Sequence, residues 1–262
     1  MSRSWIHGGV AALTLAPIAL RGQTPPAQSQ TAPPPAAVRA APPITRTGPV
    51  RAGRWKYTTT VTQGDKSQSL GTRTLSVTAT TYKGTAAWLI LETRDAGAMQ
   101  AADSLYITRV ALVPLRRSYQ MGPARVVNEF TQDSILGSVV LPQGSMPIAM
   151  AMRPGVMVNG NMLEVALQGA PLRRGWTGSA EMLVVGPQGA ATVPVELQVV
   201  GEESVTVPAG TYETWLTVVK GEQVDQRLWI AKDGNAIVKV AISVPQMPGT
   251  VAETALIEAS GR

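Results

Sequence analysis

From Arg51 onward, the sequence is built of short apolar and β-branched runs that alternate with polar residues and are separated by turn signals. In the first run, Trp55, Tyr57, Thr59 and Val61 alternate along one face. This spacing is typical of strands joined by short antiparallel connections. It predicts strands at 55–61, 75–79, 86–92, 104–112, 115–120, 124–131, 134–141, 147–152, 179–185, 191–200, 205–208, 211–220, 227–232, 236–244 and 250–258. We therefore expect one mainly all-β domain over 51–262.

One segment departs from the two-residue period. Asn161 to Gln168 carries apolar residues at helical spacing, with Glu164 three positions after Asn161 and Gly169 directly after the segment. An amide side chain followed three residues later by Glu indicates a capped helix start, and a glycine is typical of a helix end. The segment predicts a short helix, with Asn161 as its N-cap, that covers the sheet.

The N-terminus has two further parts. Arg3 and the apolar stretch from Gly8 to Leu20 are typical of a secretory signal over residues 1–22, too short to span a bilayer, with cleavage after Gly22. Residues 23–50 contain eight prolines and six alanines and predict a disordered linker. A chain that starts near Arg51 should then melt like the full mature chain. The mature protein is expected to be periplasmic or secreted and not membrane-spanning.

Several classes of chemistry are excluded by composition. The chain has no cysteine, and its single histidine, His7, lies in the predicted signal. Catalysis by Ser-His-Asp or Cys-His groups and metal sites built from His and Cys therefore lack their residues. The formal net charge is +6, but from Arg51 onward 19 basic residues face 17 acidic ones, which argues against a nucleic-acid partner.

Pairs of carboxylates are the remaining candidates for catalytic residues. The nearest approaches are Glu202 with Glu203, Asp95 with Asp103, and Asp225 with Asp233, and all were assigned to predicted turns or their flanks. There, acidic side chains usually serve to solvate a chain reversal. We therefore expect a protein that is not an enzyme and that has neither a cofactor nor a metal site.

A resemblance rests on two stretches of the C-terminal third. The run 201–215 contains Val-Pro-Ala-Gly-Thr-Tyr at 207–212, and 227–233 contains a Trp-bearing strand. Together they resemble an uncharacterised family of exported bacterial β proteins, a domain of unknown function. That family is similar in fold to the lipoprotein carriers LolA and LolB, which implies a curved, unclosed antiparallel barrel with one or two short helices over an apolar cavity. The family offers no catalytic residues, and the motif itself is explained as a turn that sets strand register.

Two functions remain open. The first is binding of a lipid or other apolar molecule in the concave face of the sheet, because tryptophans and adaptable methionines are well supplied. The candidate ligand-binding residues are Trp55, Trp88, Met150, Met152, Met157, Met162, Leu163, Trp215 and Trp229. The second is a structural scaffold or protein-interaction module of the cell envelope, in which the same residues form a filled core. Aromatic residues make up only 5% of the chain, which argues against an outer-membrane barrel with aromatic girdles.

Overall fold

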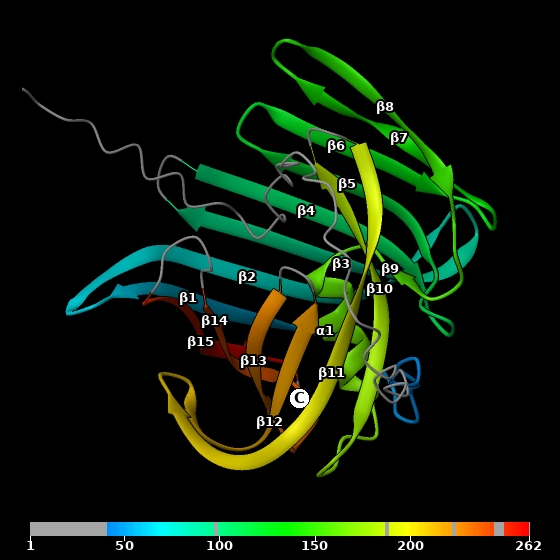
Figure 1. The fold of residues 1–262 in the computed structure, drawn as a ribbon. Coiled ribbons are helices and arrows are strands. Elements are labelled where there is room, and N and C mark those ends of the chain that lie inside the picture. Colours follow the sequence, from blue (N-terminus) through cyan, green and yellow to red (C-terminus); the bar gives the residue numbers. More distant parts are fainter. Residues whose placement is uncertain (1–40, 97–98, 187–188, 222–223, 244–248, 262) are drawn as a thin grey trace, which may run out of the picture.

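The computed structural model describes residues 41–96, 99–186, 189–221, 224–243 and 249–261. They form one large sheet and one helix (Figure 1). The predicted signal, residues 1–22, and most of the predicted linker lie outside the described residues. The strands are β1 (Gly53–Gln63), β2 (Lys66–Tyr82), β3 (Thr85–Ala96), β4 (Met99–Thr108), β5 (Pro114–Met121), β6 (Ala124–Phe130), β7 (Ser134–Leu141), β8 (Gly144–Ala151), β9 (Val156–Met157), β10 (Thr177–Gly186), β11 (Gly189–Val207), β12 (Gly210–Gly221), β13 (Val224–Ala231), β14 (Ile237–Ser243) and β15 (Thr250–Ser260).

The strand order is β8-β7-β6-β5-β4-β3-β2-β1-β15-β14-β13-β12-β11-β10-β9. Sequential strands pair antiparallel, except that the two-residue β9 runs parallel to β10. The first and last strands meet in the middle of the sheet, where Tyr57 lies opposite Leu256. This pairing joins two meanders into one sheet and confirms the predicted class, an unclosed antiparallel meander with one helix.

The sheet curves strongly, and its irregularities explain why. Register shifts occur in the pairs β1–β15, β1–β2, β4–β5, β11–β12 and β13–β14, and such bulges add local bend and twist. Strand β11 runs unbroken for 19 residues through the bulge between Val199 and Gly201, where the sequence predicted two separate strands. The curvature brings β11 into contact with β8 at the other end of the sheet.

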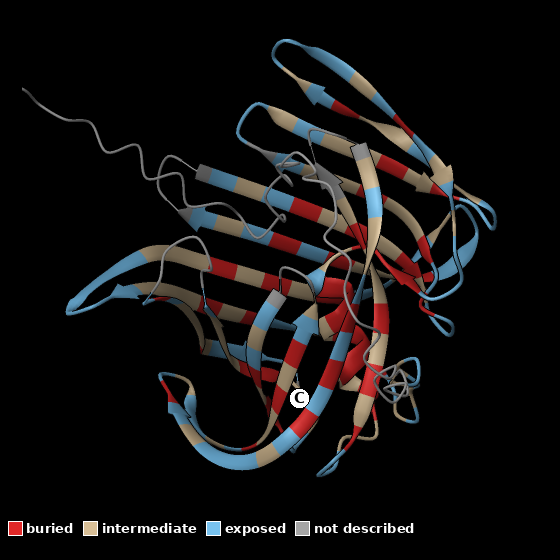
Figure 2. Ribbon diagram, in the orientation of Figure 1, coloured by how far each residue is buried: buried red, intermediate tan, exposed pale blue. Residues whose placement is uncertain are grey.

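Helix α1 (Gly160–Gln168) lies inside the curve and contacts β3 and β9 (Figure 1). Figure 2 shows buried residues concentrated on the helix and alternating along the strands. The predicted N-cap is wrong by two residues, because Asn159 has the extended backbone and accepts a hydrogen bond from the Met162 amide. Asn161 lies instead within the first turn, where its side chain is buried. Gly169 follows the helix as predicted.

The last ten residues of the predicted linker, 41–50, are docked on the domain. The backbone of this segment bonds to Ser179 of β10, and Ile44 donates to the Ser179 carbonyl at 3.0 Å. Two further amides of the segment donate to the Gly169 carbonyl at 2.8 and 3.0 Å. Val50 is buried in the core. Proline-rich composition therefore did not prevent docking, because the segment's free backbone groups find partners on the sheet edge and at the helix end.

Candidate functional site

The nine nominated residues divide into three groups. Four of them lie in the buried core around α1, namely Trp55, Met157, Met162 and Leu163. Three are half-buried and pack against that core, namely Trp88, Met150 and Met152. The last two, Trp215 and Trp229, are half-buried on β12 and β13. The structure thus buries the first group but does not unite all nine in one place.

Trp215 and Trp229 are held by polar neighbours. The Trp229 indole N–H donates to Glu203 at 2.6 Å, and Lys239 lies 5.1 Å from the centre of the same ring system. The Lys232 ammonium lies 4.7 Å from the Trp215 ring and pairs with Glu202 at 2.5 Å. Glu202 and Glu203 therefore lie in strand β11 and not in a turn as predicted, and they brace the family-like motif.

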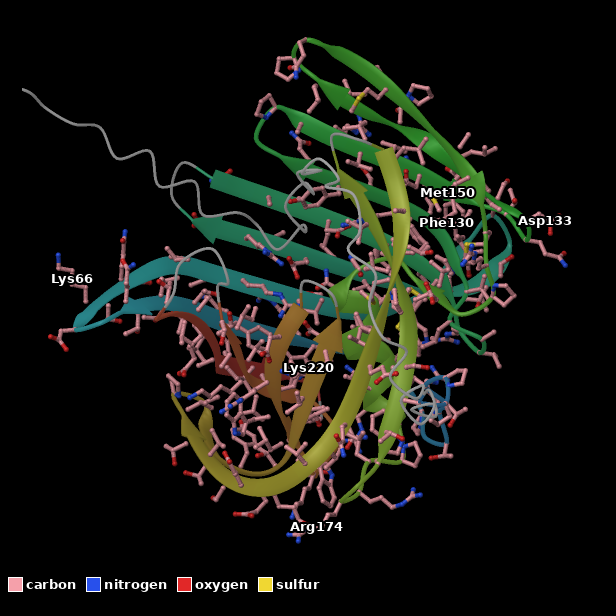
Figure 3. The ribbon with its side chains drawn as sticks, in the orientation of Figure 1. Lys66, Phe130, Asp133, Met150, Arg174 and Lys220 are labelled. Carbon is pink, nitrogen blue, oxygen red and sulfur yellow. The ribbon has the colours of Figure 1, made fainter. Side chains whose placement is uncertain are left out.

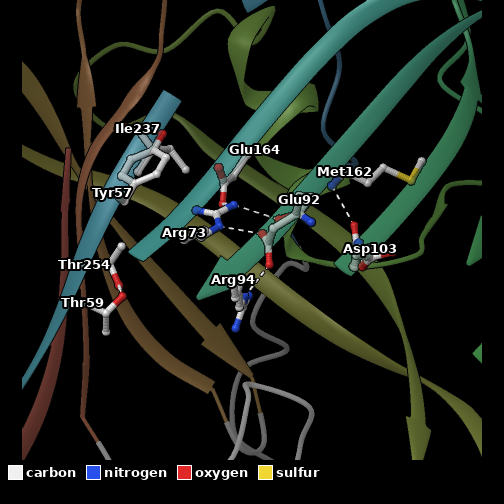
Figure 4. A network of polar contacts seen from close by, with 12 residues as sticks. Tyr57, Thr59, Arg73, Glu92, Arg94, Asp103, Met162, Glu164, Ile237 and Thr254 are labelled. Carbon is white, nitrogen blue, oxygen red and sulfur yellow. Dashed lines mark hydrogen bonds and ion pairs between the residues drawn. The ribbon is translucent and has the colours of Figure 1, made fainter. Parts of the chain in front are cut away.

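A buried charged network, which the sequence analysis missed, ties the helix to the sheet (Figure 4). The Arg73 guanidinium on β2 donates to Glu92 of β3 at 2.6 Å, and to Glu164 and Asn161 of α1 at 2.6 and 2.8 Å. Arg94 pairs with the other oxygen of Glu92. Only 10% of the Arg73 side chain is exposed and 5% of that of Glu92. Glu164 is therefore an anchor of the helix and not part of a capping box.

The protonation of this network follows from burial and from charge. Burial opposes the charged form of Arg73, but Glu164 and Glu92 outweigh it and raise the pKa of Arg73. Burial would also raise the pKa of Glu92, yet Arg73 and Arg94 hold it at about 2. For Glu164 burial prevails over Arg73, and its pKa is raised with a contribution from Glu92. The Glu164 Oε2 atom is buried and has no hydrogen-bond partner among the described residues.

A second buried pair holds the start of the helix. Arg117 of β5 bonds both carboxylate oxygens of Asp103 on β4, at 2.8 to 3.1 Å. The N-cap residue Asn159 donates to the same carboxylate at 2.7 Å. Asp103 therefore lies within β4 and faces the interior, and the prediction that it solvates a chain reversal in or beside a turn is wrong. At the other end of the helix, the Asn235 side chain donates to two carbonyls of the last turn and its exit, at 3.1 and 2.8 Å.

A signal for both pairs was present in the strand alternation. Arg73 precedes Leu75 by two residues, and Asp103 precedes Leu105 by two, so each charge shares the face of a core residue. A charged residue at an inward position requires a partner, because an unpaired buried charge is strongly unfavourable. The partner itself could not be read from the sequence, since Glu164 is 91 residues from Arg73.

The concave face is less fully covered at β6 to β8. Among inward side chains that are buried, such as Ile135 and Ile148, four apolar side chains are only half-buried, and two of these four are methionines of β8. They are Val126, Leu141, Met146 and Met150. Met150 lies near Phe130 (Figure 3), and both residues pair across the ladder with Ile135. Of the nominated residues, Met150 lies in this region, which retains accessible apolar surface.

Three further observations concern pockets, metal sites and membrane spans. A surface pocket of about 320 Å³ is lined by Pro42, Pro43, Thr45, Pro171, Arg173, Gly175, Trp176 and Thr177, none of which was nominated. Within the described ranges, no group of three or more His, Cys, Asp or Glu residues could hold a metal ion. No helix in the described part of the chain is long and apolar enough to cross a membrane.

Comparison with known proteins gives a family and a fold. The model of the DUF3108 family, described as a protein of unknown function, matches residues 45–255. A β-barrel-like DUF1849 protein from Brucella abortus has a TM-score of 0.52 at 7% identity, covering 82% of this chain and 99% of that one. This likeness shows a shared fold. No curated protein matches the chain.

Two other solved structures have lower scores. A DUF1329 family protein from Desulfovibrio piger has a TM-score of 0.35 at 7% identity, covering 81% of this chain and 86% of that one. A LolA superfamily protein from Nitrosomonas europaea has a TM-score of 0.24 at 9% identity, covering 82% and 87%.

Proposed function

Since this chain belongs to the DUF3108 family, whose function is unknown, we propose from its geometry that it is an exported, non-enzymatic protein that binds a lipid or other apolar molecule. The guest lies against the concave face of the sheet at β6 to β8. The sequence resemblance to an uncharacterised β-protein family is confirmed by the family match. The mode of binding is the proposal.

The half-buried apolar surface at β6 to β8 carries this proposal. Met146 and Met150 face inward from β8, where their unbranched side chains can adapt to guests of different shape. Strand β11 contacts β8 across the curve of the sheet, so this surface lies on the inner side of the curve. By contrast, Met162 and Leu163 are buried residues of helix α1, which is held by buried ion pairs, and Met157 is buried in the neighbouring strand β9, so all three are assigned to the core.

The binding test compares substitutions that differ in burial. Met150→Lys should weaken binding of a fluorescent fatty acid with little loss of stability, because the half-buried side chain lines the proposed surface. Ala149→Lys is the matched control, since Ala149 is exposed on the same strand and points to the other face. Equal binding by wild type and Met150→Lys would contradict this location.

The export part of the proposal rests on residues 1–22. Arg3 and the apolar stretch that follows support secretion, and N-terminal sequencing of the mature protein should find a start near Gln23. Intact Met1 on a cytoplasmic product would contradict export. Esters, peptides, glycosides and phosphates should all react at background rates, because the mature chain would contain neither histidine nor cysteine.

A scaffold or protein-interaction module of the cell envelope is the second candidate. Its supporting observation is the tightly closed core around α1, where Leu163 is 8% exposed. In both candidates Leu163→Lys should cost several kcal/mol of folding free energy, because a charge enters a filled interior. The two candidates differ in whether the surface at β8 binds an apolar ligand. A protein that binds no fatty acid and copurifies without lipid would favour the scaffold.

A further inference from the structure

Asn128 on β6 is the most unusual polar residue of the interior. Its exposed fraction is 0%, and neither its Oδ1 nor its Nδ2 atom has a hydrogen-bond partner among the described residues. Buried amides in proteins are nearly always hydrogen-bonded, because an unpartnered donor or acceptor loses its interaction with water. A side chain with both atoms unpartnered therefore points to a group that would complete it.

The strand register places this amide on the concave face. Asn128 lies opposite Arg117 of β5 and Gly137 of β7, and Gly137 lies opposite the inward Ile148 of β8. A Cβ atom at Gly137 would lie 2.5 Å from Asn128 Oδ1 and 2.0 Å from the Val127 carbonyl oxygen. Glycine at position 137 thus leaves the space on β7 that the Asn128 side chain occupies.

The rows that flank Asn128 are apolar and lead toward the accessible surface at β8. On one side Val126, Val139 and Met146 succeed one another across β6, β7 and β8. On the other side Phe130, Ile135 and Met150 do the same. The buried carboxamide thus lies between two apolar rows that lead to the proposed binding surface, beside its cross-strand neighbour Arg117.

The charge around this point is balanced. Arg117, the cross-strand neighbour of Asn128, is already paired through two of its nitrogens with Asp103. A negatively charged guest would gain little from an arginine that is neutralised in this way, and it would lose its hydration on burial. A carboxamide itself offers one acceptor oxygen and two donor hydrogens.

We propose that Asn128 binds the uncharged polar head of an amphiphilic guest, a head that both donates and accepts hydrogen bonds, such as a primary amide. This inference rests on the proposed function and specifies the chemistry of its ligand. The tail of the guest extends along Met146 and Met150. Uncharged amphiphiles of this kind are bound in preference to fatty acids of the same chain length.

The experiment uses the full mature chain and displacement of diphenylhexatriene, a fluorescent hydrocarbon without a polar head. Oleamide should displace it at lower concentration than oleate or methyl oleate does. In Asn128→Leu, the affinity for oleamide should fall by roughly tenfold, the loss expected for one or two hydrogen bonds, while the affinity for diphenylhexatriene is unchanged. If Asn128→Leu folds poorly, Asn128→Ala, which removes the carboxamide without adding bulk, should have the same selective effect.

The outcomes separate this inference from the function on which it rests. If wild type binds diphenylhexatriene but does not distinguish oleamide from methyl oleate, the head-group proposal is overturned and apolar binding stands. The same conclusion follows if Asn128→Leu keeps the preference for oleamide. If wild type binds neither probe, the apolar-ligand function fails, and the head-group proposal fails with it.

Discussion

Removal of the Arg73 guanidinium tests whether the buried network stabilises the fold. Arg73→Met keeps much of the side-chain volume but leaves Glu92 and Glu164 without their shared cation. Their side chains are 5% and 14% exposed, so water can replace little of the lost interaction. Breaking a buried ion pair by removing one partner costs about 3–5 kcal/mol. For a domain of this size that corresponds to a fall in melting temperature of roughly 6–20 °C.

Urea unfolding followed by tryptophan fluorescence measures this loss, with Arg54→Met as the matched control. Arg54 is exposed on the neighbouring strand β1, and its substitution should change stability by no more than about 0.5 kcal/mol. The additional substitution Glu164→Gln should restore part of the stability of Arg73→Met, because one of the two unpaired carboxylates is then gone.

The pH dependence of the loss provides the refuting observation. In Arg73→Met the carboxyl groups of Glu92 and Glu164 lose their shared cation, so their pKa values rise, and acid protonates them at higher pH than in wild type and removes the penalty. The stability difference between wild type and Arg73→Met should therefore shrink as the pH falls toward 4. A loss below about 1 kcal/mol at pH 7, or a loss that does not change with pH, would refute the view that Arg73 compensates these charges.

Three further predictions concern the same domain. The folded-state pKa of Glu92 is lowered from 4.5 to about 2, so its contribution to stability, roughly 3 kcal/mol, is present above pH 4.5 and lost as the pH falls toward 2. The urea midpoint of Glu92→Gln should therefore decline less steeply over that pH range than the midpoint of wild type. Parallel curves for the two proteins would contradict this prediction. Asn235→Ala should cost about 1–2 kcal/mol in urea unfolding by removing two hydrogen bonds to the end of α1. Asn235→Gly accepts the positive φ of 52° but should still lose those bonds, so wild-type stability in both variants would exclude a capping role. A chain starting at Arg51 should melt below one starting at Ala41, because burial of a valine such as Val50 contributes roughly 1.5–3 kcal/mol; equal melting temperatures would show that the docked segment adds nothing.

Strand positions were well predicted because the relevant information is local. Alternation of apolar and polar residues marks the inward face of each strand, and Trp55, Tyr57, Leu75 and Val77 are buried as that pattern requires. The helix was found for the same reason, since its apolar spacing and Gly169 lie within one short segment. Its N-cap was misplaced because Asn159 and Asn161 are equivalent candidates by residue type, and only their backbone conformation distinguishes them.

The candidate site was only partly predicted. The sequence indicated methionine-rich apolar surface, but it did not show that Met162 is buried in the core while Met150 is half-buried. It also missed the inward charges, because each was judged by its neighbours in sequence and not by the face on which its strand places it. Asp103 was consequently read as a turn residue although it is buried within β4.

The sequence by itself thus determined the class of the fold, its strands, its helix and the face that each strand buries, since all of these follow from periodicities of two and 3.6 residues. Only the tertiary structure decided how distant segments meet: β1 beside β15, Arg73 beside Glu164, and residues 41–50 on β10. Such contacts depend on the curvature and register of the whole sheet, to which every bulge contributes. No local pattern specifies them, and the same long-range geometry leaves Asn128 buried without a partner among the described residues.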